Sequence, residues 1–129
     1  MSSGQLVVRL GSVLAALPAA AVRRVARALP LAPLPGSSGA LLGLIEFAGE
    51  PLPVLDLARL LDSGVERSAP PSVTVIAWVG AARERELVGL AVDEALDVAT
   101  LEPSEIPGEA SRLGAPVRLV DLERLELGR

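Results

Sequence analysis

The chain of 129 residues contains no cysteine, histidine, tyrosine or lysine, and only 2 % of it is aromatic. Without cysteine there can be no disulfide framework and no thiolate metal site. Without histidine, cysteine and tyrosine, most general bases and nucleophiles are missing as well. The composition therefore predicts a protein that is not an enzyme and that needs no metal or cofactor.

The chain also lacks a net positive charge and long apolar runs. The net charge is −4, whereas a nucleic-acid binder needs a basic surface and stacking aromatic rings. No stretch approaches the roughly 18 apolar residues of a membrane helix. The start of the chain faintly resembles a signal peptide, but Arg9 comes too late for a basic n-region and QLVVRL alternates like a strand. We expect a cytoplasmic protein with no nucleic-acid partner and no direct membrane insertion.

What the chain does contain is a repeated pattern of twelve residues. Gly49–Leu60 reads GEPLPVLDLARL, and Gly114–Leu125 reads GAPVRLVDLERL, 65 positions later, with six of the twelve positions identical. The alternative is coincidence in a leucine-rich composition, but Gly, Pro, Asp and Arg recur in register with the leucines. Gly permits a turn, Pro can open an edge strand, and Asp can cap the short helix that follows. Two copies predict two similar small lobes.

Short apolar segments between turn signals predict an all-β barrel or sandwich. Gly11 and Ser12 predict a two-residue hairpin, and Gly49 followed by Glu50 predicts a type II′ turn between two further strands. Ala19–Leu29 fits a helix and a strand equally well. The predicted strands are Gln5–Leu10, Val13–Leu17, Ala40–Phe47, Leu52–Leu55, Val73–Val79, Leu87–Val92, Leu96–Leu101 and Val117–Val120, with a short helix at Asp56–Leu61, a last helical turn at Asp121–Leu125 and a boundary at Asp62–Ser72.

Two groups of carboxylates could carry chemistry. Asp93, Glu94 and Asp97 could hold a hard cation, but no spaced ligand loop accompanies them, so a solvated turn is the better interpretation. Asp56 and Asp121 could act as a paired acid and base, but helix capping explains both without chemistry.

The densest basic group is formed by three arginines. Arg23, Arg24 and Arg27 are either a polar rim or a contact for an anion or an acidic helix, and the residues alone do not decide between the two.

Four stretches resemble the CheW family of chemotaxis coupling proteins, in the order and approximate spacing of that family. They are LPAAAVRRVARALPLAPLPG, LLGLIEFAGEPLPVLDLARLL, VTVIAWV and ELVGLAVDEALDV. The most specific pieces are Gly43 with GEPLPVLDL, and VGLAVDEALDV at Val88–Val98, which resembles the family's G-x-x-V-D-x-V-x-D-V. The resemblance covers nearly the whole chain, whose short length is similar to that of divergent FrzB-type members.

The resemblance implies two SH3-like β-barrels packed together in a single CheW-like domain over residues 1–129. The first barrel would span roughly residues 11–62 and the second roughly 73–125, with the N-terminal strand shared between the lobes. The resemblance also implies no catalysis and a role in bridging chemoreceptor tails to a CheA-type histidine kinase.

This sequence departs from the family pattern in three places. The family's N-L-R-G turn is Glu46–Gly49 here, so that Ala48 replaces its Arg, and Arg24 replaces a Glu. The segment between Leu101 and Gly114 is shorter than the family leads us to expect. The repeat shows the same deficit, because Val25 to Gly49 spans 24 positions and Val98 to Gly114 spans 16. We therefore expect a second barrel shortened by about one strand.

The resemblance places the receptor tip in a groove between the lobes, where apolar residues would form the floor and Arg24 a rim charge. Some of the apolar candidates fit an inter-barrel core equally well. The receptor-groove candidates are Val22, Arg24, Gly43, Ala48, Val92 and Ala95, and the kinase-interface candidates are Leu87, Leu90 and Leu96.

These inferences combine into a non-enzymatic adaptor of a bacterial chemosensory array that binds the cytoplasmic domain of methyl-accepting chemoreceptors. A CheA-type histidine kinase or other CheW-like proteins are the second expected partners, through an interface weakened by the shortened barrel. The alternatives are a free-standing β-barrel that binds a ligand or regulates without receptor contact, and an enzyme that uses Asp56 or Asp93.

Overall fold

The computed structural model describes residues 4–27, 30–32, 39–62 and 71–127, and these residues form an almost entirely β structure. The predicted all-β class is therefore confirmed. In chain order the elements are β1 (Gln5–Leu10), β2 (Val13–Pro18), the 3-10 turn η1 (Ala19–Ala21), β3 (Val22–Arg27), β4 (Leu41–Phe47), β5 (Glu50–Asp56), α1 (Leu57–Leu60), β6 (Val73–Val79), β7 (Glu86–Val92), β8 (Glu94–Ala99), β9 (Glu102–Pro103), β10 (Glu109–Arg112) and β11 (Ala115–Leu119).

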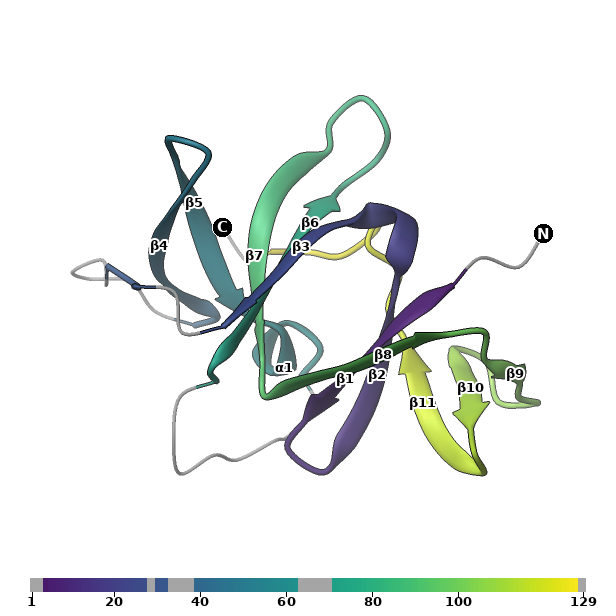
Figure 1. Ribbon diagram of the computed structural model, residues 1–129. Helices are drawn as coiled ribbons and strands as arrows, with labels where there is room; N and C mark the ends of the chain where they lie inside the picture. The colour runs from purple at the N-terminus through teal and green to yellow at the C-terminus, as the bar shows by residue number, and fades with distance from the viewer. Residues whose placement is uncertain (1–3, 28–29, 33–38, 63–70, 128–129) are drawn as a thin grey trace.

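The strands form two curled sheets, which we call lobe 1 and lobe 2 (Figure 1). Lobe 1 has the strand order β3-β6-β7-β5-β4, and lobe 2 has the order β8-β1-β2-β11-β10-β9. This division differs from the expected boundaries, since β6 and β7 belong to lobe 1, and the N-terminal hairpin β1–β2 belongs to lobe 2. The repeated pattern marks only one strand of each lobe, so it carries no information about which other strands pair with it. The central part of the expected boundary segment, residues 63–70, lies outside the described residues.

The two lobes share one pairing scheme. In lobe 1, β5 runs parallel to β7, and in lobe 2 the repeated strand β11 runs parallel to β2. The outer strands match as well, because β3 skips Arg23 in its pairing with β6, and β8 skips Leu96 in its pairing with β1. The lobes are thus internal repeats, and the chain's N-terminal hairpin completes the second one. The registers make Val22 equivalent to Ala95, Arg24 to Asp97, and Val25 to Val98.

One apolar core joins the lobes. It contains Leu6, Leu10 and Leu17 from lobe 2 together with Leu55 and Leu90 from lobe 1. Fully burying such a side chain contributes roughly 1.5–3 kcal/mol relative to leaving it exposed. β6 and β7 are buried on both faces, as the apolar run Val73–Val79 predicts. One face packs on the shared core, and the other face packs on a smaller apolar cluster inside lobe 1. The shared core holds the two sheets as one body.

The turns at the start of the two repeated patterns have the same geometry. Ala48 and Gly49 have φ of 53° and 81°, and Leu113 and Gly114 have φ of 51° and 84°. Two successive positive φ values are the mark of a type I′ turn, so the predicted type II′ turn is wrong. The cause is the register, since Phe47 pairs with Glu50 and Gly49 becomes the second central residue rather than the first. The two-residue hairpin at Gly11 and Ser12 is confirmed by the pairing of Leu10 with Val13.

Both repeated aspartates act as caps, as predicted. The Ala58 amide donates to Asp56 Oδ1 over 3.1 Å, and the Glu123 amide donates to Asp121 Oδ1 over 3.1 Å. The first cap starts α1, whereas the second starts only a hydrogen-bonded turn, in which the Arg124 amide donates to the Asp121 carbonyl over 3.2 Å. The helical turn expected at Asp121–Leu125 is therefore observed as this single hydrogen-bonded turn.

The strand expected to be missing from lobe 2 is present in reduced form. β10, with four residues, occupies the place of the seven-residue β4, and the two-residue β9 pairs with its other side. Only Ala110 of Glu109–Arg112 is buried, so the other three positions can be polar. Its pairing with β11 uses backbone groups, which do not require apolar side chains. The shortening of the second barrel is thus a loss of strand length and of side-chain volume.

The ambiguous segment Ala19–Leu29 forms η1 and β3, with residues 28–29 outside the described part of the chain. Pro18 precedes η1, and the Ala19 amide donates to the Gly4 carbonyl over 3.0 Å. After this contact the chain leaves β2 of lobe 2 and continues into β3 of lobe 1.

Candidate partner-binding surface

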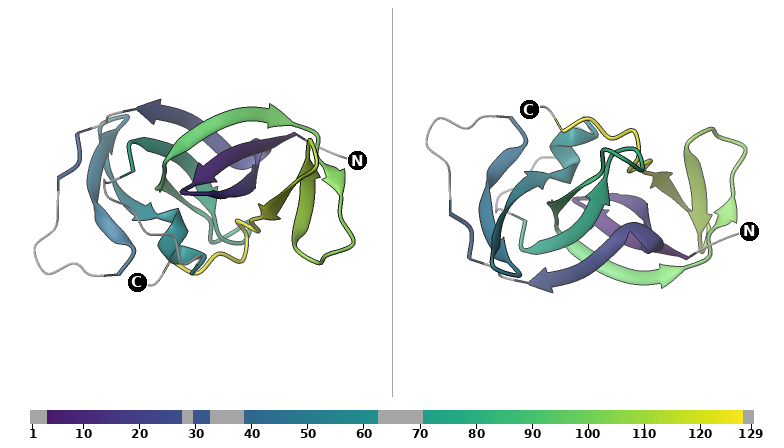
Figure 2. Two further views of the ribbon diagram at one scale, coloured as in Figure 1. Left: turned by 90° about the horizontal axis from the view of Figure 1, so that it is seen from below. Right: turned by 90° about the horizontal axis from the view of Figure 1, so that it is seen from above.

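β3 and β8 are the outermost strands at one end of each sheet. Figure 2 shows both strands along the same side of the molecule, while α1 and the C-terminal segment lie on the opposite side. Each of the two equivalent edge strands has one residue, Val22 on β3 and Ala95 on β8, that packs against the core shared by the lobes. This side of the molecule holds three of the six receptor-groove candidates, namely Val22, Arg24 and Ala95.

Four apolar residues on these strands form what we call the junction surface: Val22 and Val25 on β3, and Ala95 and Val98 on β8. Val22 and Ala95 are half-buried and pack against the shared core. Val25 and Val98 lie on the same faces of their strands but are 39 % and 61 % exposed. The junction surface thus continues the shared core outward to solvent. The sequence analysis missed Val25 and Val98, which the equivalence of β3 and β8 brings to notice.

β3 also carries three arginines, of which Arg24 lies opposite Ile76 and therefore on the other face of the strand from Val22 and Val25. Arg23, Arg24 and Arg27 are exposed. Within the described part of the chain, none of them forms a hydrogen bond or an ion pair. β3 therefore presents three positive charges that no described residue pairs.

The charges of β8 are neutralised by neighbouring side chains. Asp97 accepts hydrogen bonds from Arg112 Nη2 over 2.7 Å and from Nε over 3.3 Å. These hydrogen bonds raise the pKa of Arg112, an already strong base. Glu94 lies 3.7 Å from Arg9. The edge of lobe 2 therefore carries little uncompensated charge, in contrast to β3.

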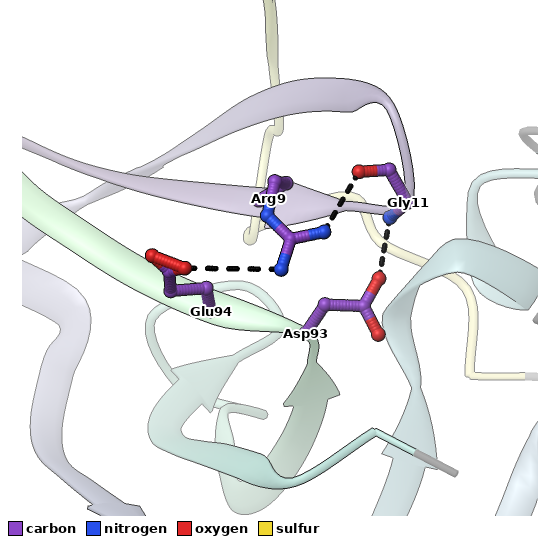
Figure 3. A network of polar contacts seen from close by, with 4 residues as sticks. All are labelled: Arg9, Gly11, Asp93 and Glu94. Atoms are coloured by element: carbon purple, nitrogen blue, oxygen red, sulfur yellow. Dashed lines mark hydrogen bonds and ion pairs between the residues drawn. The ribbon is translucent and has the colours of Figure 1, made fainter. Parts of the chain in front are cut away.

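The link between β7 and β8 is fixed to the N-terminal hairpin by a polar network (Figure 3). The Gly11 amide donates to the Asp93 carboxylate, and Arg9 Nη1 donates to the Gly11 carbonyl over 3.0 Å. The Asp93 amide in turn donates to the Arg9 carbonyl over 3.0 Å. The acidic residues that could have held a cation thus interact with donors of the chain itself.

The other receptor-groove candidates do not join the junction surface. Val92 is 0 % exposed and belongs to the shared core, which is the alternative that the sequence left open for it. Gly43 is buried in β4. Ala48 is exposed at the tip of the β4–β5 hairpin, away from β8 (Figure 1). These three residues are therefore not part of one surface with Val22 and Ala95.

The kinase-interface candidates also separate. Leu90 is 0 % exposed in the shared core, so it offers no atom to a partner. Leu87 is half-buried and packs on the small cluster of lobe 1, and Leu96 is the half-buried bulge residue of β8. Of the three, only Leu96 is on lobe 2, because β7 belongs to lobe 1.

Lobe 2 has a less complete interior than lobe 1. Ala110 and Val117 face each other where lobe 1 has Ile45 and Leu52. A hollow of about 790 Å³ opens on this lobe, with Leu14 and Leu119 among its lining residues. The shortened lobe therefore presents less apolar side-chain volume than its counterpart.

Comparison with known proteins shows the family to which the chain belongs. The CheW-like domain matches residues 5–125, and the chain belongs to the CheW family. Protein FrzA from Myxococcus xanthus is 32 % identical over 108 residues, which cover 80 % of this chain and 65 % of FrzA. The match therefore spans just under two thirds of the length of FrzA. The FrzB-type assignment stays a prediction.

The fold is similar to that of a solved family member. The crystal structure of the scaffolding protein TtCheW from Thermoanaerobacter tengcongensis has a TM-score of 0.75 to this chain, with 20 % identity over 97 % of this chain and 92 % of TtCheW. The two lobes are the two SH3-like barrels of this fold. No helix in the described residues is long and apolar enough to cross a membrane.

Family membership confirms two expectations. The domain is that of a family of scaffolds or adaptors of chemotaxis signalling, and this family is non-enzymatic. The enzyme alternative built on Asp56 or Asp93 is therefore wrong, in agreement with the capping and bridging contacts of these two side chains.

Proposed function

We propose that this protein is a cytoplasmic adaptor that binds the cytoplasmic tip of a methyl-accepting chemoreceptor through the junction surface. One observation carries the proposal. Val22 and Ala95 pack against the shared core, Val25 and Val98 lie exposed on the same faces of β3 and β8, and β3 also carries three exposed arginines without partners among the described residues. Helical partners dock by placing apolar anchors on such a surface, with charges at the rim. Among the original candidates, Val22, Arg24 and Ala95 keep this role, and Val25 and Val98 join them.

The test is binding of the purified protein to a soluble chemoreceptor tip, measured by isothermal titration calorimetry. Val25→Glu and Val98→Glu place a charge on the junction surface, and losing a central anchor typically costs 2 kcal/mol or more. We expect an affinity loss of about 30-fold, since 1.4 kcal/mol corresponds to tenfold. Leu113→Glu is the control, because Leu113 is 93 % exposed at the β10–β11 turn of lobe 2. Unchanged affinity in both valine variants would remove the junction surface from the receptor site.

A second contact follows from lobe 2. We propose that a CheA-type kinase or another CheW-like protein binds there more weakly than a full-length barrel would allow, with Leu96 as the accessible candidate. β10 has four residues where β4 has seven, and Ala110 and Val117 replace the larger Ile45 and Leu52. Fewer large side chains leave fewer anchors, and anchors dominate such interfaces.

Separate titrations with a receptor tip and with a kinase regulatory domain distinguish the possibilities. Receptor binding with weak kinase binding is expected. Tight kinase binding that is lost on Leu96→Glu would contradict the weakened interface. Binding to neither partner would favour the alternative of a free-standing ligand-binding or regulatory barrel.

A further inference from the structure

In the part of the chain that the structure describes, the two sheets have four outer strands, and three of these are protected against pairing with another chain. On β4, Leu44 exchanges two backbone hydrogen bonds with Ala32, of 2.8 and 2.9 Å. β9 has only two residues, of which the second is Pro103. β3 carries three exposed arginines. A covering segment, a very short strand with a proline and exposed charges all keep a sheet edge from pairing.

β8 is the outer strand that lacks such protection. It has six residues, it pairs only with β1, and no further backbone hydrogen bond reaches it from the described residues. Figure 2 shows it along the outside of the molecule. Its two charged side chains already have partners in the same chain, Glu94 in Arg9 and Asp97 in Arg112. The free edge of β8 therefore offers backbone donors and acceptors with little uncompensated charge.

Val98 lies at the centre of the continuous part of this edge. The bulge at Leu96 interrupts the strand, so the regular stretch is Asp97–Ala99, in which Val98 is 61 % exposed. A two-fold axis beside Val98 would place it opposite Val98 of a second copy, and Asp97 opposite Ala99. This arrangement brings no like charges face to face. The edge is thus complementary to itself, which a two-fold symmetric contact requires.

The same arrangement is unfavourable on β3, although the internal repeat makes Val25 the equivalent of Val98. A two-fold axis beside Val25 would bring Arg23 of one copy next to Arg27 of the other, and this would happen twice. Like charges that face each other across a strand pair destabilise it. The repeat therefore provides one edge that accepts a second copy and one that repels it.

We propose that the protein forms a two-fold symmetric dimer in which β8 pairs antiparallel with β8 of a second copy around Val98. The pairing joins the two lobe 2 sheets into one continuous sheet. Because the paired stretch is short, the interface is smaller than the roughly 1,000 Å² of a stable complex, and the dimer forms only at high protein concentration. The dimer does not depend on the proposed receptor contact, but both use Val98, so one copy makes only one of them at a time.

The first test is disulfide cross-linking of the full chain, which has no native cysteine. Residues opposite each other on antiparallel strands have Cβ atoms about 4.5–5.5 Å apart, within the range in which a disulfide forms. Val98→Cys should therefore cross-link to a dimer under mild oxidation. Val25→Cys is the matched control on β3, and Leu113→Cys, at a position 93 % exposed, reports random collision. We expect Val98→Cys to react at least about tenfold faster than both, because its thiols are held together.

Two further variants test the physical reason. Val98→Lys places like charges at the axis and should keep the chain monomeric in sedimentation equilibrium at concentrations at which the native chain and Leu113→Lys associate. Arg23→Gln combined with Arg27→Gln removes the repulsion on β3 and should accelerate cross-linking of Val25→Cys. An unchanged rate in that variant would overturn the explanation by charge.

Equal cross-linking rates for Val98→Cys and Leu113→Cys would overturn the dimer. The same conclusion follows if the native chain remains monomeric at the highest concentration reached. No receptor is present in these measurements, so either result would leave the proposed function intact. Failure of the receptor titrations would in turn leave the dimer intact.

Discussion

Asp56 and Asp121 occupy the same position of the repeat and make the same capping bond, yet their surroundings differ. Asp56 is 6 % exposed and starts α1 beside the shared core, whereas Asp121 is exposed. When an exposed capping side chain is removed, water can bond the backbone amide that it capped. When a buried capping side chain is removed, that amide stays unsatisfied. The same residue at the same position of the repeat therefore contributes differently to the free energy of unfolding in the two lobes.

We predict that Asp56→Ala lowers the free energy of unfolding by about 1–2 kcal/mol, and Asp121→Ala by about 0.5–1 kcal/mol. Urea denaturation with both variants and the exposed control Arg83→Ala measures the difference. Midpoints equal to that of the native chain in both aspartate variants would show that the caps do not stabilise the repeat.

At the scale of the element, β10 is the clearest departure between the lobes. Its four residues pair with β11 on one side and with only two residues of β9 on the other. The Arg112–Asp97 ion pair links β10 to β8 across lobe 2. Short edge strands open locally at low free-energy cost because few contacts must break. Lobe 2 is therefore closed in part by side chains where lobe 1 relies on a longer strand.

Hydrogen exchange should reveal this difference. We expect the amides of β9 and β10 to exchange faster than those of β4, and Arg112→Ala to accelerate exchange in β10 further. Arg118→Ala is a comparison on the neighbouring strand, because Arg118 donates to the Leu61 carbonyl and does not contact β8. Equal protection of β4 and β10 would contradict the view that lobe 2 is the weaker barrel.

At the scale of the whole molecule, the N-terminal hairpin is an integral part of lobe 2. β1 and β2 lie between β8 and β11, and they supply Leu6, Val8, Leu10 and Leu17 to the shared core. Domains of this kind have a net stability of about 5–15 kcal/mol. Each buried Leu or Val accounts for roughly 1.5–3 kcal/mol of that balance.

Removal of residues 1–18 should therefore abolish cooperative folding of both lobes, and not of the second alone. Circular dichroism with thermal unfolding measures this, and removal of residues 1–3, which precede β1, is the control. A truncated chain that keeps a cooperative transition would show that lobe 1 folds without the shared core.

The sequence by itself determined the local features that depend on neighbouring residues. The twelve-residue repeat predicted two lobes, the caps at Asp56 and Asp121, and the turns at Gly49 and Gly114, because turn and cap chemistry acts within a few residues. The same reasoning did not find the turn type, since that depends on a register between strands. It also predicted the loss of a strand where the backbone keeps one, because polar side chains on β10 do not prevent backbone pairing.

Only the tertiary structure decided which strands form each lobe and which candidate residues meet. Val92 and Leu90 look like Val22 and Leu96 in the sequence, yet the first two are 0 % exposed and the latter two border solvent. The N-terminal hairpin joins β8 and β11 from far along the chain, and this pairing makes β3 and β8 equivalent edges. The contrast between the arginines of β3, which have no partner among the described residues, and Asp97, which is paired with Arg112, follows from that arrangement. Long-range pairing decided these features because burial and charge neutralisation depend on neighbours in space, which the order of residues does not specify.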